Sequence, residues 1–122
     1  MKLEDATKEE LVWWIKNNAF SLYFNEHRFE SDILFRRSAL STERGRAAGE
    51  RYSAALVKYT DLLEPYLGRP LTEIPDHVIK KGAALEREMK AASKEQDTAH
   101  KEWERLNRKI DALMSRKEVV HD

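Results

Sequence analysis

Two long segments of the chain carry an uncharged side chain at every third or fourth position, and this repeat constrains the fold most strongly. It persists in a chain of which 36% of residues are charged. Spacings that alternate three and four average about 3.5 residues, the repeat of helices packed in a left-handed coiled coil. The repeat positions are Phe24, His27 (taken as neutral), Ser31, Leu34, Ser38, Ser41, Gly45, Ala48, Tyr52, Ala55, Tyr59, Leu62 and Tyr66, then Val78, Gly82, Leu85, Met89, Ala92, Gln96, Ala99, Trp103, Leu106, Ile110 and Leu113.

The start of the chain predicts a short helix before the first repeat. Thr7 and Glu10 have the spacing of a capping box, in which each residue satisfies a backbone N–H of the other. We therefore expect a helix over 7–17. The first long helix is expected over 20–66, because the three-and-four spacing of its uncharged positions runs without a break, and no period-two pattern predicts a strand.

A glycine and prolines mark the turn between the two repeats. Gly68 and the prolines that follow it stop a helix, so we expect a loop over 67–75. The second long helix is expected over 76–117, with Thr72 or Asp76 as its N-cap. The prediction is one all-α unit spanning residues 1–122, a short helix followed by a long helical hairpin.

The short loop makes the two long helices antiparallel and fixes their register. In that register Leu62 faces Gly82, and Gly45 faces Ala99. Each glycine inside a helix costs about 1 kcal/mol relative to alanine, so Gly45 and Gly49 could break the first helix. The repeat keeps its phase across both glycines, and we therefore expect one continuous helix.

The aromatic residues concentrate near the start of the chain and predict a small three-helix core there. Adjacent helix positions point about 100° apart, so Trp13 and Trp14 cannot both face inward. The outward one is either covered by Val119 and Val120 or is an anchor for another protein. For the inward side, we expect Leu11, Trp14 and Ile15 to pack onto Phe24, Leu34, Ile110 and Leu113.

A second, weaker apolar stripe runs beside the first repeat, and nothing left in the chain would cover it. Such a stripe predicts a partner helix. A second copy of the chain is the simplest source, so we expect a homodimer that assembles a helical bundle. The stripe comprises Phe35, Ala39, Gly49, Leu56, Leu63 and Leu67, with Val57 and Ile79 near it.

Composition excludes several classes of protein. There is no cysteine, which removes disulfides, thiolate nucleophiles and cysteine-based zinc sites. Lys plus Arg and Asp plus Glu both number 22, so the whole chain is not attracted to nucleic acid or anionic membranes. The apolar run 11–15 is far shorter than the ~20 residues that cross a bilayer, and the polar N-terminus predicts no signal peptide. We therefore expect a cytoplasmic protein.

Catalytic and cofactor motifs are absent from the sequence. No serine lies in a Gly-x-Ser-x-Gly elbow, and no glycine belongs to a phosphate-binding or dinucleotide fingerprint. Glu26, His27 and Glu30 could bind iron or manganese, but helical di-iron sites need a repeated Glu-x-x-His pattern. We predict no enzyme, no cofactor and no metal, and keep a helical metalloprotein as the least favoured alternative.

The favoured function is non-enzymatic protein–protein interaction, as a scaffold, an assembly factor or a small inhibitor. The expected contact residues are Trp13, Phe35, Leu56 and Leu63.

The alternative is a nucleic-acid-associated protein that uses an arginine-rich stretch. Arginine contacts phosphates and releases counterions, so a basic flank on a helix can lie along DNA or RNA. Glutamates interleave with these arginines, however, and mixed charges more often form a solvated face. The candidate residues are Arg36, Arg37, Arg44, Arg46 and Arg51.

Overall fold

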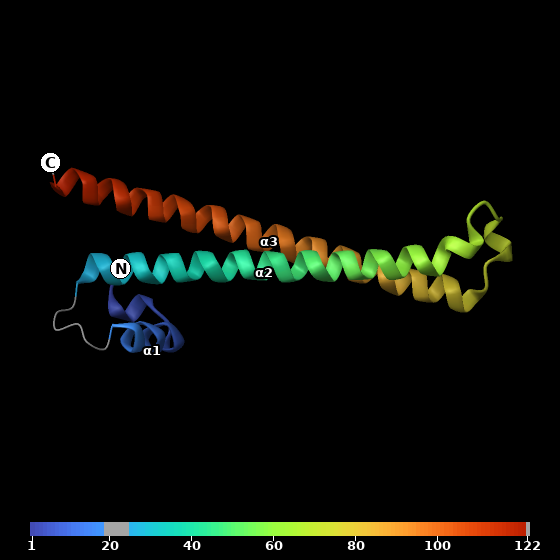
Figure 1. Ribbon diagram of the computed structural model, residues 1–122, viewed down its shortest axis with the longest axis horizontal. Helices are drawn as coiled ribbons and strands as arrows, with labels where there is room; N and C mark the ends of the chain where they lie inside the picture. Colours follow the sequence, from blue (N-terminus) through green and yellow to red (C-terminus); the bar gives the residue numbers. More distant parts are fainter. Residues whose placement is uncertain (19–24, 122) are drawn as a thin grey trace. The chain divides into compact units, whose positions relative to one another are not determined.

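Figure 1 shows the computed structural model, which describes residues 1–18 and 25–121, with side chains up to residue 116. Every regular element in these residues is a helix, so the prediction of an all-α fold is confirmed. The elements are η1 (Leu3–Asp5), α1 (Lys8–Asn17), α2 (Glu26–Leu63), η2 (Glu64–Tyr66), η3 (Leu71–Glu73) and α3 (Asp76–His121).

The capping box predicted for the first helix is confirmed. Thr7 precedes α1 and its side chain accepts a hydrogen bond from the Glu10 N–H at 3.1 Å, while the Glu10 carboxylate accepts one from the Thr7 N–H at 2.8 Å. Two otherwise unpaired backbone donors are thereby satisfied. The observed helix matches the predicted one to within a residue.

The first long helix is shorter than predicted at both ends. It begins at Glu26 because the side chain of Asn25 caps it, accepting a hydrogen bond from the Arg28 N–H at 3.0 Å. Residues 20–24 of the predicted helix lie outside the described residues. The α-helix ends at Leu63 because Pro65 cannot continue it, and the chain goes on as a 3-10 turn.

The interior of α2 is continuous, as predicted, through Gly45 and Gly49. After the turn, α3 starts at the predicted Asp76 and extends to His121, four residues past the predicted end. Thr72 lies in the separate turn η3, and Asp76 is already the first helical residue. The predicted N-caps were therefore wrong, because the Pro75 carbonyl accepts the first hydrogen bonds, from the Val78 and Ile79 N–H groups. Gly68 has φ of +78°, a left-handed conformation that favours glycine at the turn.

The chain forms two compact units, each containing part of α2 and part of α3. Unit 1 comprises Met1–Ser41 and Glu102–Asp122, and unit 2 comprises Thr42–Lys101. None of the described helices is long and apolar enough to span a membrane.

The core of unit 1 lies between α2 and α3. Leu34, Leu106, Ile110 and Leu113 form a buried apolar cluster, against which Met1 and Met114 pack. Leu34 and Ile110, which were predicted to face each other, thus lie in the same cluster.

Helix α1 contacts a different face of α2 from the predicted one. The ring of Trp14 lies edge-on to Phe29, with 5.2 Å between centroids, and its Nε1 donates to Asp32 at 3.1 Å. Phe29 and Ile33 are fully buried and, one turn apart, lie on the same side of α2. The prediction for Ile15 was wrong, because its side chain is 59% exposed.

The α2–α3 contact in unit 2 is made by small side chains. Ala48, Ala55, Ala92 and Ala99 are buried. A Cβ added to Gly45 would lie 3.6 Å from that of Ala99, which confirms the predicted pairing of these two positions.

The pairing of Leu62 with Gly82 is also confirmed, since a Cβ on Gly82 would lie 3.9 Å from Leu62 and 3.7 Å from Tyr59. Three predicted repeat positions are nevertheless exposed, namely Tyr52, Gln96 and Trp103. We attribute this to the close backbone approach that neighbouring small residues permit, which leaves no room for a long side chain between the helices.

Candidate interaction surfaces

The residues considered as metal ligands are paired with cations of the chain. Glu30 lies 3.1 Å from the Met1 amino group and 3.7 Å from Arg116, and Glu26 lies 3.9 Å from the same amino group. The Nε2 atom of His27 is buried without a hydrogen-bond partner among the described residues. Within those residues, no cluster of three or more His, Asp or Glu side chains is arranged to hold a metal ion.

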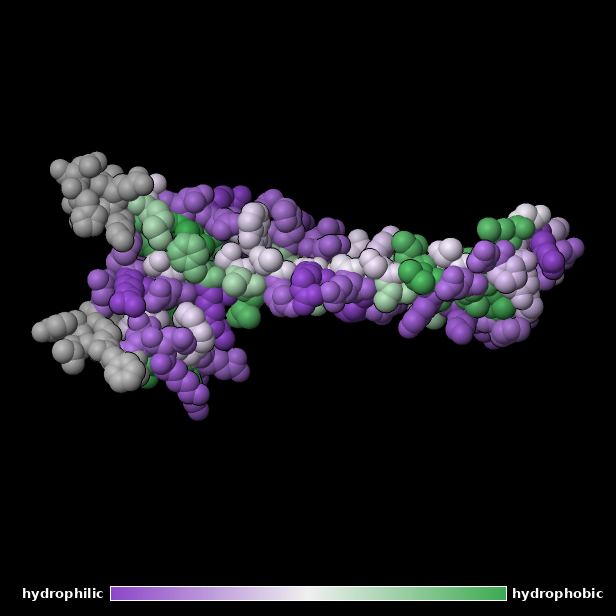
Figure 2. Space-filling view, viewed as in Figure 1, coloured by the Kyte–Doolittle hydropathy of each residue, from purple (hydrophilic) through white to green (hydrophobic). Residues whose placement is uncertain are grey.

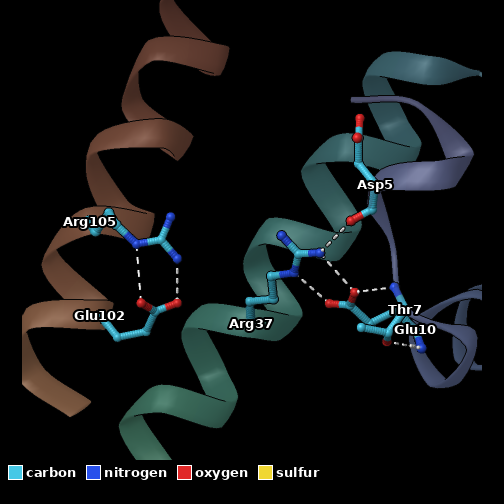
Figure 3. Close-up of polar contacts among 6 residues, drawn as sticks. All are labelled: Asp5, Thr7, Glu10, Arg37, Glu102 and Arg105. Atoms are coloured by element: carbon cyan, nitrogen blue, oxygen red, sulfur yellow. Dashed lines mark hydrogen bonds and ion pairs between the residues drawn. The ribbon is translucent and has the colours of Figure 1, made fainter. Parts of the chain in front are cut away.

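Arg37 joins α2 to α1 through a buried carboxylate. Its Nε donates to Glu10 Oε2 at 2.5 Å, and its Nη2 donates to Glu10 Oε1 at 2.8 Å and to the Asp5 carbonyl at 3.2 Å (Figure 3). Glu10 is only 5% exposed. The hydrogen bonds from Arg37, helped by the Thr7 N–H, lower the pKa of Glu10 to about 2. Glu10 and Arg37 thus stay ionised and hold α1 in place.

Arg36, the neighbouring candidate for nucleic-acid binding, is also engaged. Its guanidinium carbon lies 5.3 Å from the centroid of the Trp13 ring, a cation–π geometry. Trp13 and Trp14 are both half-buried, so the assignment of one of them to an edge stays a prediction. The proposed cover of that tryptophan, Val119 and Val120, lies outside the described side chains.

The remaining candidate arginines belong to unit 2 and are paired with glutamates. Arg44 and Arg51 bridge from α2 to Glu95 and Glu88 of α3, the latter at 2.9 Å. Arg46 pairs with two glutamates of its own helix, one on each side in the sequence, which raises its pKa. The paired glutamates offset the positive charge that would attract a phosphate, so this pairing weighs against the nucleic-acid alternative.

The predicted apolar contact residues are distributed over both units. Trp13 and Phe35 belong to unit 1, where Phe35 is 51% exposed. Leu56 and Leu63 belong to unit 2, where Leu56 is 42% exposed and Leu63 is half-buried. Hydrophobic side chains are visible on the surface in Figure 2, notably over the end of α2 and the start of α3.

Some exposed apolar residues were not predicted from the sequence. Leu40 and Val12 in unit 1 and Leu71 in unit 2 are each exposed. The apolar pattern beside the repeat gave no signal for Leu40, which is flanked by small and polar residues. Val12 could have been found, because it lies opposite the buried side of α1 at helical spacing.

A continuous apolar strip on α2 in unit 2 is defined by Gly49, Tyr52, Leu56 and Leu63. Gly49, Leu56 and Leu63 are spaced seven residues apart and so lie on one side of the helix. Tyr52 lies one turn before Leu56. An open hollow of about 550 Å³ lies at the Gly49 end, between Tyr52 and Gln96. We call this surface the α2 strip.

Compared with protein-family models, curated proteins and solved structures, the chain matches none of them. The surfaces of the two units are therefore the evidence from which a function can be proposed.

Proposed function

We propose that this chain is a non-enzymatic protein–protein interaction module, acting as a scaffold, an assembly factor or a small inhibitor. The α2 strip packs against the same strip of a second copy, so that the active form is a homodimeric helical bundle. Because the chain has no cysteine, a reducing compartment suits it, and the proposed location is the cytoplasm.

The exposure of Leu56 is the observation that carries this proposal. In unit 2, the buried residues of α2 are Ala48 and Ala55, and Leu56, which follows Ala55, remains 42% exposed. Tyr52, one helical turn before Leu56, is also exposed. Apolar side chains at helical spacing, left uncovered by the chain itself, are the usual docking surface of an amphipathic partner helix.

The charges around the strip favour such a contact. Arg46 pairs with Glu50, and both line the hollow beside Gly49 and Tyr52, so this end of the strip is bordered by a neutralised ion pair. Protein interfaces commonly combine an apolar centre with a polar rim. The net charge of zero leaves little electrostatic repulsion between two copies.

Light scattering after size-exclusion chromatography, across protein concentration, tests the proposal. We expect a mass of about twice the 14.3 kDa of one chain. Leu56→Glu places a charge in the strip and should shift the protein to the monomer. Ala54→Glu is the matched control, because the exposed Ala54 lies on the opposite side of α2 and should leave the dimer intact.

A wild-type protein that stays monomeric at every concentration would contradict the dimer. Equal dissociation by both variants would also contradict it, since the effect would then come from the added charge and not from the strip.

A further inference from the structure

The outward side of α1 carries a hollow that the α2 strip does not include. The hollow has a volume of about 370 Å³ and is lined by Lys8, Glu9, Val12, Trp13 and Lys16. All these residues belong to unit 1. The opposite side of α1 contacts α2, where Glu10 accepts from Arg37 and Trp14 donates to Asp32. We call the lining residues the α1 face.

An apolar centre and two cationic ends define the α1 face. Lys8, Val12 and Lys16 follow one another at intervals of four, so they lie along one side of the helix. Val12 is 42% exposed between two exposed lysines. This order matches a ligand that offers an apolar side chain with anionic groups on both sides of it.

Trp13 gives the face a fixed aromatic wall. The Arg36 guanidinium, 5.3 Å from the ring centroid, supports the indole from α2. A side chain already held in place loses little conformational entropy when a ligand packs on it. Tryptophan and arginine are also the residues most enriched at the centres of protein interfaces.

The local charge is positive although the chain is neutral overall. Lys8 and Lys16 line the hollow, against the single carboxylate of Glu9, and Arg36 adds a positive charge over the Trp13 ring. In the part of the chain that the structure describes, neither lysine forms an ion pair. Both ammonium groups can therefore pair with an incoming anion without first leaving an intramolecular carboxylate.

We propose that the α1 face binds an acidic amphipathic segment of another protein, which places a leucine or aromatic side chain against Val12 and Trp13. The flanking carboxylates of that segment pair with Lys8 and Lys16. The inference rests on the proposed function as an interaction module and supplies the chemistry of the partner. A protein segment is favoured over an anionic membrane because Glu9 would face the lipid phosphates and α1 has only 10 residues.

The test uses a synthetic helical peptide with leucine on one side and glutamate on the other, labelled for fluorescence anisotropy. We expect a Kd of about 1–100 μM for this small interface, tighter at low salt. Lys8→Glu with Lys16→Glu should weaken binding about tenfold, and Lys8→Gln with Lys16→Gln somewhat less. Lys80→Glu with Lys90→Glu, at exposed lysines of unit 2, is the matched control and should leave the Kd unchanged.

Three controls identify the occupant. A peptide with the same leucines and lysine in place of glutamate should not bind, and vesicles of equal parts phosphatidylcholine and phosphatidylserine should not bind. The wild type and the Lys8→Glu with Lys16→Glu variant should give the same mass in light scattering.

No binding of the acidic peptide, equal binding of the lysine peptide, or binding of the vesicles alone would overturn the proposal. A loss of the dimer in the lysine variant would overturn it too, because the α1 face would then belong to a second copy. The effect of Leu56→Glu on the mass is measured in a separate experiment. The dimer can therefore be contradicted without contradicting peptide binding at the α1 face, and the reverse also holds.

Discussion

Units 1 and 2 are built on the same two helices but fill the contact between them with side chains of different size. The large side chains that are fully buried, Phe29, Ile33, Leu34 and Leu106, all belong to unit 1. The buried hydrophobic residues of unit 2 are alanines and Val78. Each buried methylene contributes about 0.8 kcal/mol, so unit 1 gains more from burial per contact than unit 2.

The polar contacts of unit 1 are also more deeply buried than those of unit 2. In unit 1, the Glu10 carboxylate is buried and accepts hydrogen bonds from the Nε and Nη2 atoms of Arg37. In unit 2, the ion pairs of Arg46 and Arg51 lie on the surface, where such pairs contribute little. The comparison teaches that α1 completes a core in unit 1, whereas unit 2 keeps apolar side chains uncovered, the surface that we propose a second chain covers.

The largest expected effect is the loss of a core leucine from unit 1. Leu106 is fully buried, so Leu106→Ala should lower the free energy of unfolding by about 3–5 kcal/mol through lost burial and a cavity. Leu62→Ala makes the same change in unit 2, where the side chain is half-buried, and should cost about 1–2 kcal/mol. Urea denaturation followed by circular dichroism measures both, and equal costs would break the comparison.

Removal of the buried charge at Glu10 should have the next largest effect. Glu10→Gln leaves Arg37 without its anion and should cost about 2–3 kcal/mol at neutral pH. Glutamine has nearly the same shape, so the loss reports charge and not packing. A cost below about 0.5 kcal/mol, the range of surface substitutions, would show that the pair does not hold α1 in place.

The same pair predicts a pH dependence. The pKa of Glu10 is lowered from its ordinary 4.5 to about 2, so the folded state holds fewer protons than the unfolded state in this range. Its contribution to stability is complete above about pH 5 and is lost as the pH falls towards 2. Urea denaturation at intervals between these values should show a shallower decline for Glu10→Gln than for the wild type. Parallel declines would rule Glu10 out as the cause.

A smaller effect, of opposite sign, is expected in the small-residue contact of unit 2. Gly45→Ala should raise the free energy of unfolding by about 0.5–1 kcal/mol, because alanine favours the helix and its Cβ would lie 3.6 Å from that of Ala99. Gly68→Ala is the control, since φ of +78° makes any L side chain strained there, and it should destabilise. Thermal melts distinguish the two directions, and destabilisation by Gly45→Ala would mean that the contact is tighter than described.

The smallest effect is expected for a surface ion pair of unit 2. Arg46 lies between Glu43 and Glu50, and all three side chains are more than half exposed. Arg46→Ala should therefore leave the free energy of unfolding nearly unchanged in urea denaturation, and any small change should shrink further in high salt. A cost comparable to that of Glu10→Gln would erase the polar difference between the units.

The α2–α3 contact was predictable because charged residues surround its uncharged positions. The alternating spacing identified Leu34, Ala48, Ala99 and Leu106, all of which are buried. Antiparallel pairing followed from the short turn. The capping box at Thr7 was predictable for a similar reason, since both partners lie within a single helical turn.

The position of α1 was not predictable, because it depends on contacts between residues far apart in the sequence. Phe29 and Ile33 lie outside the repeat, which records only the side of α2 that faces α3. Nothing local marks Arg37 as the partner of Glu10, and by charge alone Arg37 resembled a candidate for nucleic acid. The early end of α2 is signalled by Pro65, because a proline disfavours the helical conformation at the residue before it.

The candidate surfaces were predictable only in part. Leu56 was singled out by its place beside the repeat, and it is exposed. Of the α1 face only Trp13 was predicted from the sequence, because a lysine on either side of Val12 carries no signal of binding by itself. The significance of these lysines depends on which side of α1 is buried, and that depends on the contacts of Glu10 and Trp14.

The central claim, that another chain covers the α2 strip of unit 2, is tested most directly by hydrogen exchange at two protein concentrations. At low concentration, the account predicts slow amide exchange around Leu34 and Leu106 in unit 1 and faster exchange around Leu56. At high concentration, the amides around Leu56 should become slow while those of unit 1 stay unchanged. Exchange around Leu56 that does not vary with concentration would contradict the account.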